Sequence, residues 1–591
     1  MTENASAAPL IGVLAKPDDY DIVREFFELF KTPWEFCRRD RRYQVLLHAN
    51  GTAAVGDADL VLLYGSEATS FDRECRQRPG SARRNTTLSW AGETLPVYGK
   101  AVSFPAGDAG RDVVVADTGE AVTWTSRVGA KTVVRIGYDL FSEIRYLLTT
   151  GQPPVHAGIP TLERHIALLR SSIVRAGIPV VEIPPIPANH RFIVCLTHDL
   201  DHPSIRLHRF DRTTIGFLYR ALVGSVIKVF QRRLSLAGLR RNFAAALKLP
   251  FVHLGWAEDF WLRFDRYLQL ERGLASTFFV IPVKGEPGRT VNGPASRVRA
   301  SAYGVSDIAE RVRSLVTAGS EVGVHGIDAW LDSDHGLKER EAVSRAAGAP
   351  ATGVRMHWLF FDEAAPSRLD QAGFDYDSSF GYNQTVGFRA GTMQAFKPLT
   401  ARRVLEIPLA IMDTALFYPA HLNLAAEAAT QLVRPLVDHA ELYGGVLTVN
   451  WHDRSLAPER LWGGFYADLL DELKGRAPWF STGADAVSWF HQRRSVVFNS
   501  IRCDGNSLHV SASARCQEHL PGLRLRVYTP HGAGTNGTPA GHPADIFTDV
   551  TFTNTVNAHV SLHARIAATR EDYQAEPSLN GPRVDMVRPT S

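Results

Sequence analysis

Two aspartates separated by a single residue stand in the run Thr197-His198-Asp199-Leu200-Asp201-His202. Two carboxylates at this spacing can divide a reaction between them, because one can bind a divalent metal ion while the other takes a proton from water. A loop that caps a helix would have a similar composition. The four titratable side chains in this run follow an apolar segment directly, which favours a reaction centre.

Three further polar clusters follow along the chain, at His325, at Arg355 with His357, and at His452 with Asp453. An arginine beside a buried carboxylate lowers the pKa of that carboxylate. A histidine next to a carboxylate suits general acid catalysis, with Asp453 holding the imidazolium. Taken singly, each cluster is equally compatible with a structural histidine or a surface salt bridge. Their order along the chain is what predicts a common site.

The polar clusters end apolar runs that have the character of strands buried on both faces. Helical patterns lie between these runs, and such alternation predicts a parallel sheet or barrel. In that architecture the catalytic groups lie at the carboxyl ends of the strands. The runs are residues 192–197, 276–281, 321–324 and 445–449.

The length of 591 residues exceeds one hydrophobic core and predicts several domains. We expect an α/β fold, with a distorted (β/α) barrel over 188–494 as the catalytic domain. An N-terminal α/β domain with its linker is expected over 1–187, and a small β-rich domain over 495–591. The stretch 65–95, rich in Ser, Thr, Gly and Arg, reads as loops.

Composition excludes several classes of protein. The net charge is only +3, so no nucleic-acid partner is expected. Five scattered cysteines give neither a disulfide framework nor a zinc ribbon. Residues Met1–Pro9 lack the features of a secretory signal, and no apolar stretch of membrane-spanning length is evident. The expected location is cytoplasmic.

The segment from about 191 to 490 resembles the polysaccharide deacetylases, the NodB-homology group or carbohydrate esterase family 4. The resemblance implies a distorted barrel and a divalent metal site. It further implies Asp199 as the base, Asp201 and His325 as metal ligands, Arg355 as the group that orients the base, and His452 as the general acid. The motifs that carry it are 197–201, 276–280, 321–325, Arg355, 373–379 and 447–453.

The sequence departs from this group at one metal ligand. The group usually has a second histidine four residues after the first, where this chain has Ala329. His357 is the first candidate for the missing ligand, and His198, His202 and Asp328 are alternatives. The expected ion is zinc, with cobalt, nickel or manganese as alternatives.

The resemblance implies hydrolysis of an N-acetyl group, and Arg389, Trp451 and Asp377 are expected to bind the substrate. Residues 387–392 resemble a bacterial surface-polysaccharide branch of the group. The expected partner is therefore an N-acetylated glycan or a lipid-linked sugar precursor in surface polysaccharide or O-antigen synthesis. Two alternatives remain at this point, a hydrolase of small C–N amides and a catalytically inactive glycan-binding protein.

A basic insertion separates the first motif from the next strand. Residues 206–248 hold ten Lys and Arg side chains, and Asp211 is the only acid. The apolar part, Ile215 to Phe230, is interrupted by Arg220 and Lys228, which makes it too short and too charged to span a bilayer. Peripheral membrane contact through 205–248 and a pair of ordinary solvated helices are equally compatible with this pattern.

Overall fold

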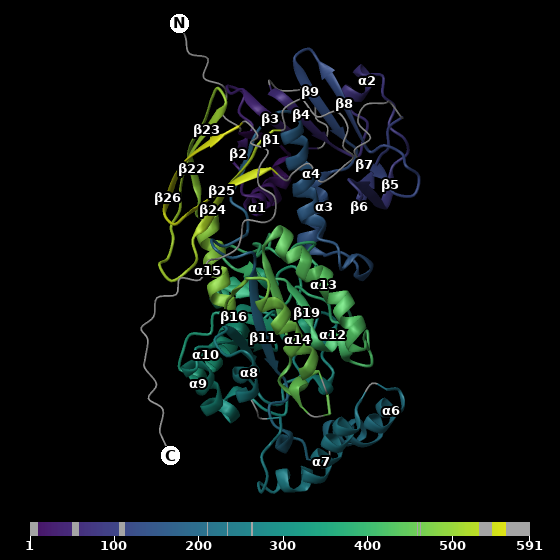
Figure 1. Cartoon of the computed structure of the whole chain (residues 1–591), viewed down its shortest axis with the longest axis vertical. Helices are drawn as coiled ribbons and strands as arrows, with labels where there is room; N and C mark the ends of the chain where they lie inside the picture. Colours follow the sequence, from purple (N-terminus) through teal and green to yellow (C-terminus); the bar gives the residue numbers. More distant parts are fainter. Residues whose placement is uncertain are drawn as a thin grey trace, which may run out of the picture.

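The computed structural model arranges the chain as a central barrel, with two smaller units at one end and the insertion at the other (Figure 1). The segment Met1–Pro9 lies outside the residues that the structure describes, as does part of the β-rich domain expected over 495–591. The described residues are 10–49, 58–105, 113–209, 211–232, 234–261, 264–457, 459–460, 462–530 and 546–562.

The barrel is built on a nine-stranded parallel sheet with the order β18-β17-β16-β15-β12-β11-β20-β19, and β21 also pairs with β11. The apolar runs predicted from the sequence form its central strands, because side chains on both faces are buried. The sheet curls into a distorted (β/α) barrel, as expected. Its strands are β11 (Ile193–Leu200), β12 (Ser276–Val280), β15 (Glu321–Gly326), β16 (Gly353–Met356), β17 (Tyr376–Asp377), β18 (Leu405–Glu406), β19 (Leu409–Met412), β20 (Val446–Asn450) and β21 (Trp479–Phe480).

Helices cover this sheet and bury its outer face. The principal ones are α8 (Phe264–Leu270), α9 (Ala309–Thr317), α10 (Ser333–Ala347), α11 (Ala365–Ala372), α13 (Ala426–Tyr443), α14 (Gly463–Lys474) and α15 (Gly483–Arg494). Most of their apolar side chains form one core with those of the strands, while α15 packs in a second core that is shared with the C-terminal unit. The first core fixes the strand ends on which the polar clusters stand.

The N-terminal unit is an α/β layer with a mostly parallel sheet of order β2-β1-β3-β4-β9-β8. A second sheet of order β6-β5-β7 packs beside it. The interpretation of 65–95 as loops was wrong, since β5 and the start of β6 occupy much of it. The elements are β1 (Ile11–Leu14), α1 (Tyr20–Phe30), β2 (Trp34–Phe36), β3 (Tyr43–His48), β4 (Ala58–Tyr64), α2 (Ser70–Glu74), β5 (Arg83–Trp90), β6 (Glu93–Ala101), β7 (Val113–Val115), β8 (Thr123–Val128), β9 (Lys131–Ile136), α3 (Leu140–Thr149) and α4 (Thr161–Arg175).

The C-terminal unit consists of two three-stranded sheets, of orders β22-β23-β26 and β10-β24-β25. Strand β10 comes from before the barrel and directly precedes residues 183–187, which were expected to be the linker, so a segment expected to belong to the N-terminal domain pairs with this unit. Residues 183–187 are buried rather than solvated. The strands are β10 (Val180–Glu182), β22 (Val497–Asp504), β23 (Ser507–Ser513), β24 (Leu523–Tyr528), β25 (Phe547–Phe552) and β26 (Thr555–Ser561).

The insertion forms two long helices that pack side by side. The first runs through α5 (Arg212–Tyr219), a π-helical turn (Arg220–Gly224) and α6 (Ser225–Phe230), and the second is α7 (Leu236–His253). Within the described chain, Arg212–Phe230 is the single helix whose length and composition would let it cross a membrane, with a mean hydropathy of 1.3 and 22% of it buried. The sequence had suggested that this stretch was too short and too charged.

Candidate active site

The polar clusters meet in one cavity at the carboxyl ends of the barrel strands. Strands β20, β11, β12, β15 and β16 are successive neighbours in the sheet, so the residues that end them converge. The cavity has a volume of about 460 Å³. Its wall includes Asp199, Asp201, His325, His357 and His452. Five of the predicted site residues are therefore brought together.

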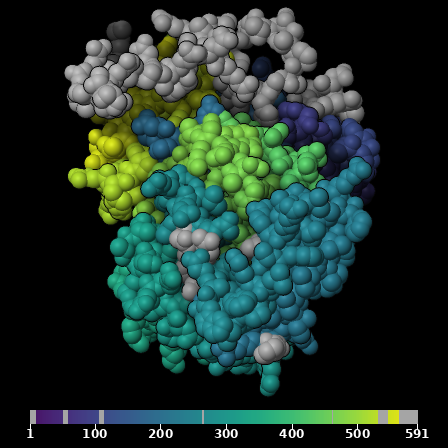
Figure 2. All heavy atoms as spheres, turned by 60° about the horizontal axis from the view of Figure 1, so that its bottom comes forward, coloured from purple at the N-terminus to yellow at the C-terminus, as the bar shows by residue number. Residues whose placement is uncertain are grey.

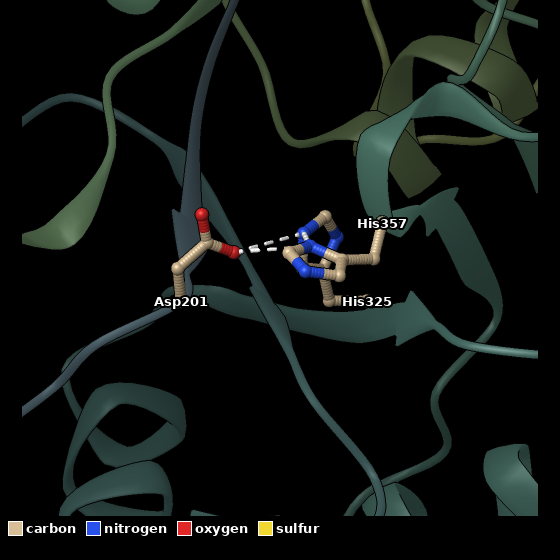
Figure 3. Close-up of side chains that lie close together, drawn as sticks. All are labelled: Asp201, His325 and His357. Atoms are coloured by element: carbon tan, nitrogen blue, oxygen red, sulfur yellow. Dashed lines mark hydrogen bonds and ion pairs between the residues drawn. The ribbon is translucent and has the colours of Figure 1, made fainter. Parts of the chain in front are cut away.

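Asp201, His325 and His357 place three ligand atoms around one point (Figure 3). Asp201 Oδ1 lies 3.2 Å from His325 Nε2 and 3.3 Å from His357 Nδ1. The two histidine nitrogens are 3.0 Å apart. Asp201 Oδ1 is buried but receives no hydrogen bond of good geometry. One carboxylate and two imidazoles converging in this way match the donor set of a divalent transition metal.

The protonation states of this cluster also suit metal binding. Burial alone would raise the pKa of Asp201, but His357 and His325 hold it well below its ordinary value. Burial lowers the pKa of His357, which favours the neutral ring that binds metal. His325 Nδ1 lies 3.0 Å from the carbonyl oxygen of Arg355, so it carries the proton and leaves Nε2 free to ligate.

A strained turn follows β16 and carries His357. Trp358 and Leu359 have φ values of 63° and 55°, which non-glycine residues rarely adopt. The buried Arg299 supports this turn by donating to the carbonyl oxygens of His357, at 2.8 Å, and of Ile327, at 3.1 Å. Buried hydrogen bonds of this kind can offset the strain.

The other three ligand candidates have different partners. His198 Nε2 lies 3.0 Å from Glu271 Oε1, beneath the site. His202 lines the cavity, but its Nδ1 faces His208 Nε2 at 3.1 Å. Asp328 accepts a hydrogen bond from the backbone of Arg289. The structure therefore groups His357, the first candidate, with Asp201 and His325.

Asp199 is arranged to stay ionised in a buried position. Its Oδ1 accepts a hydrogen bond from Arg355 Nη1 at 3.0 Å, and its Oδ2 accepts one from Asn450 Nδ2 at 2.7 Å. Burial alone would raise the pKa of Asp199, but Arg355, His325 and His452 lower it below its ordinary value. Arg355 thus has the contact predicted for it, and Asn450 is a partner that the sequence did not single out.

His452 is held by Asp413, not by Asp453. Its ring Nδ1 lies 2.6 Å from Asp413 Oδ1, and its backbone N–H donates to Asp413 Oδ2 at 2.7 Å. Burial alone would lower the pKa of His452, but Asp413, with Asp201 and Asp199, raises it to about 10. Its Nε2 faces the cavity, 3.8 Å from Asp201 Oδ2. The imidazole is therefore protonated at neutral pH.

The role predicted for Asp453 is corrected by this geometry. Its carboxylate accepts the backbone N–H groups of His202, at 2.7 Å, and of Arg454. Burial and the charge of Asp201 raise the pKa of Asp453 to about 7. Asp453 therefore fixes the backbone after Asp201. The carboxylate that holds the imidazole comes instead from α12 (Asp413–Phe417), the short helix that follows β19.

The three residues expected to bind substrate do not line the cavity. Trp451 is fully buried and stacks on Tyr466, with ring centroids 4.9 Å apart. Asp377 is buried and accepts the hydroxyl of Ser379. Arg389 donates to the carbonyl of Gly381 and lies over the ring of Phe380.

Several residues at the cavity wall were missed by the sequence reading. They include Arg299, Trp358, Tyr418 and Arg454. Trp358 is 41% and Tyr418 39% exposed, so their rings present apolar surface to whatever enters. The sequence shows Trp358 directly after His357, but it does not show that the Trp358 ring lines the cavity.

No protein-family model matches the sequence, and no curated protein matches it in sequence. Among solved structures, the chain is similar to a polysaccharide deacetylase from Mycobacterium smegmatis, at 17% identity and a TM-score of 0.32, over 52% of this chain and 94% of that one. It is similar to a polysaccharide deacetylase from Pseudomonas aeruginosa PAO1, at 14% identity and a TM-score of 0.33, over 52% and 94%.

A third similar structure extends beyond the barrel. The carbohydrate deacetylase Agd3 is 7% identical, with a TM-score of 0.33, and the similarity covers 93% of this chain and 99% of that one. These structures carry the names of the group that the motifs resemble.

Proposed function

We propose that this chain is a metal-dependent hydrolase that removes N-acetyl or related acyl groups from sugar residues. The observation that carries the proposal is the convergence of five groups in one cavity. Asp201, His325 and His357 form a metal-binding set, while Asp199 and His452 stand beside it in opposite protonation states. A base and an acid next to a metal site are what amide hydrolysis requires.

Asp199 is suited to take a proton from the attacking water. Its pKa is held down, so it is ionised at neutral pH. An ionised carboxylate has about four lone-pair sites, and Arg355 and Asn450 each occupy one. The remaining sites accept the proton of water, while the two donors fix the direction of the carboxylate.

His452 is suited to give a proton to the leaving nitrogen. Asp413 binds Nδ1, so the proton on Nε2 faces the cavity. An amide nitrogen leaves as an amine only once it is protonated, because the free amide anion is too basic to depart. His452 therefore supplies the proton as the C–N bond breaks.

The balance of atoms is that of a simple hydrolysis. The oxygen of water bonds to the acyl carbon, one proton of water passes to Asp199, and the proton of His452 passes to the sugar nitrogen. A divalent ion, when bound by Asp201, His325 and His357, supplies the Lewis acidity that polarises the acyl carbonyl and acidifies water. Solvent exchange returns the proton from Asp199 to His452.

The finer identity of the substrate is part of the same proposal. We expect an N-acetylated glycan or a lipid-linked sugar precursor in surface polysaccharide or O-antigen synthesis, with zinc as the ion and a cytoplasmic, membrane-associated location. The motif at 387–392 supports the substrate, and the mixed Asp and His ligands support zinc. The presence of His357 in the ligand set argues against an inactive glycan-binding protein.

The test combines metal content with acetate release. Purified protein is dialysed, its bound metal is measured by mass spectrometry, and acetate is measured on N-acetylated sugars and glycans. We expect about one divalent ion per chain, and a loss of metal and activity in His357→Ala. The matched control is His335→Ala, an exposed histidine on α10. Full metal content and activity in His357→Ala would contradict the proposal.

A further inference from the structure

The insertion holds an unusual share of the exposed apolar surface. Of the 25 large apolar side chains that are exposed among the described residues, twelve lie between Ile215 and Trp256. That segment is less than a tenth of the chain. Phe230 is 84%, Leu247 75% and Trp256 75% exposed. Such a concentration of exposed apolar side chains is typical of a surface that binds another protein or a membrane.

The first helix of the insertion has its large side chains on the outside. Its buried positions at Thr214, Phe217, Ala221 and Ser225 recur every three or four residues and define the packed face. Three of these four side chains are small. The opposite face carries a second apolar stripe, which is exposed and consists of Ile215, Tyr219, Leu222, Val223, Ile227 and Phe230.

The second helix repeats the pattern. The packed face of α7 consists of Gly238, Asn242, Ala245, Leu249 and Val252, and the first three of these are small or polar. Asn242 Nδ2 donates to Ser225 Oγ at 2.7 Å and so links the two helices. The outward stripe on α7 and the turn after it consists of Leu236, Phe243, Leu247, Phe251, Leu254 and Trp256.

At the base of the insertion Phe217, Leu249 and Val252 pack in an apolar cluster. Farther from the base, the arrangement is the reverse of a water-soluble helical hairpin. In water, large apolar side chains pack between the helices and polar ones face out. Small residues between the helices, a polar side-chain link and outward apolar stripes are typical of helices that contact lipid. This distribution of side chains therefore indicates that lipid covers the exposed apolar surface of the insertion.

The charge of the insertion selects the kind of lipid surface. Ten Lys and Arg side chains and one acid lie within residues 206–248. Arg209, Arg240, Arg241 and Lys248 are exposed beside the apolar stripes. Basic side chains that flank an apolar helix face bind anionic headgroups while the apolar side chains enter the layer beneath.

The insertion stands at the same end of the barrel as the cavity. It begins a few residues after Asp201, and it returns at Trp261, whose ring lies under Arg454 of the cavity wall. Ile205, Phe217, Trp261 and Ala457 pack together at its base. Figure 2, which turns this end forward, shows the insertion covering a large part of it.

We propose that the insertion, residues 206–256, docks this end of the barrel on an anionic lipid bilayer. The outward apolar side chains enter the interfacial layer, and the basic side chains contact the headgroups. The helix Arg212–Phe230 does not cross, because α7 would then have to return through the bilayer with Arg240, Arg241 and Lys248. The contact is therefore peripheral.

Docking has a consequence for the substrate, and this consequence rests on the proposed function. With its mouth held at the headgroup layer, the cavity meets acylated amino sugars that are attached to lipid before it meets those in solution. The substrate class that fits this geometry is an N-acylated sugar carried on a lipid. Membrane binding itself depends on the surface alone and can be tested without any substrate.

The first test is flotation of the full-length protein with vesicles of phosphatidylcholine containing phosphatidylglycerol. The variant replaces Phe230, Leu236, Leu247 and Trp256 by serine. We expect wild type to float with the vesicles and the variant's partition coefficient to fall at least about tenfold, because four apolar side chains no longer enter the layer. Wild type that stays in solution overturns the proposal.

The matched control replaces exposed apolar residues elsewhere on the chain by serine. They are Val155, Val291, Leu442 and Val497. We expect the control to float like wild type. A control that loses binding as the variant does would overturn the proposal. Wild-type protein that forms a dimer and does not bind vesicles would also overturn the proposal, because a second copy of the chain would then cover this surface.

The second test addresses the headgroups. Vesicles of phosphatidylcholine alone, or added salt, are expected to reduce binding by about tenfold or more. Replacing Arg209, Arg240, Arg241 and Lys248 by glutamate is expected to abolish binding to the anionic vesicles. The control changes four exposed basic residues of the N-terminal unit to glutamate: Lys16, Arg73, Arg78 and Arg84. This control is expected to bind the vesicles as wild type does. Equal binding to neutral and anionic vesicles contradicts the anionic surface.

Activity on a soluble substrate separates the two proposals. The four-serine variant of the insertion leaves the cavity wall intact, so it is expected to release acetate from a soluble N-acetylated sugar as wild type does. Flotation without any acetate release would contradict the proposed function and leave docking supported. Acetate release without flotation would do the reverse.

Discussion

The barrel and the insertion place their apolar side chains in opposite ways. In the barrel, Phe278 and Leu447 are fully buried in the sheet. In the insertion, Phe230 and Leu247 are largely exposed, and small side chains such as Ala221 are buried instead. Burial of large apolar groups stabilises a fold in water, so this packing contributes to the stability of the barrel. The insertion gains comparable free energy only from an apolar surface outside the chain.

The difference teaches that the two regions have separate tasks. The barrel holds the reacting groups in fixed positions by dense packing, and a substitution there changes the reaction or the fold. The insertion is attached at the rim of the cavity and changes where the barrel works. Substitutions in the two regions are therefore expected to have effects of different kind and size.

The largest effect is expected at the base. Asp199→Asn removes the proton acceptor while keeping the shape, so acetate release is expected to fall at least about 10³-fold. Acetate release from a soluble N-acetylated sugar gives the measurement, and thermal unfolding checks the fold. The control is Asp334→Asn, an exposed aspartate on α10, which is expected to leave the rate unchanged.

Loss of rate in the control, or a rate for Asp199→Asn close to that of wild type, would remove Asp199 from the reaction. If the four-serine variant of the insertion loses activity on a soluble sugar as Asp199→Asn does, the barrel and the insertion do not have separate tasks. The insertion would then be part of the catalytic machinery.

The next effect is on stability and compares two leucines. Leu447→Ala leaves a cavity in the barrel core and is expected to lower the free energy of unfolding by about 2–5 kcal/mol. Leu247→Ala removes the same atoms from an exposed position and is expected to cost less than about 0.5 kcal/mol. Urea unfolding measures both. Equal losses would show that Leu247 is covered in solution and would contradict the reversed packing.

Three strand ends of the barrel could be predicted from the sequence because the apolar runs 192–197, 321–324 and 445–449 are directly followed by polar side chains. Neighbouring parallel strands bring such residues together, so Asp199, Asp201, His325, Arg355 and His452 meet as expected. The direction of a side chain just past a strand was not predictable. Trp451, next to His452, faces the core, because its ring packs on Tyr466.

The partner of His452 shows another limit. Asp453 is adjacent in sequence, but Asp413 reaches the ring, because β19 pairs with β20 so that Met412 lies opposite Asn450. That register depends on tertiary packing and leaves no local pattern. The same holds for Asn450 and Arg299, whose roles come from contacts between distant segments. The sequence predicts loops in 65–95 because β5, although its residues alternate, contains few apolar side chains.

Asp413→Asn is expected to have an intermediate effect, visible in the pH profile. The carboxylate of Asp413 raises the pKa of His452 to about 10, against the effect of burial. Without it the pKa falls, so the acid loses its proton at lower pH. The alkaline limb of kcat/KM is expected to move down by about three pH units, toward the ordinary histidine value, and the rate at pH 8 to fall about 10- to 100-fold.

Asp453→Asn is the matched control for this profile. Asp453 contacts backbone N–H groups rather than the ring, so its removal is expected to leave the alkaline limb nearly in place. If Asp453→Asn moves the limb and Asp413→Asn does not, the assignment of Asp413 is wrong. Either result identifies which carboxylate of the barrel sets the pKa of His452.

The smallest effect is expected inside the insertion, at Asn242. Its side chain is fully buried and donates to Ser225 Oγ, which links the two helices. A net hydrogen bond contributes about 1 kcal/mol, so Asn242→Ala is expected to speed amide hydrogen exchange in α5–α7 about fivefold. Barrel strands are expected to exchange as in wild type, because the insertion opens without them. Faster exchange in β11 or β20 would show that the two regions unfold together and that their separation of tasks does not extend to stability.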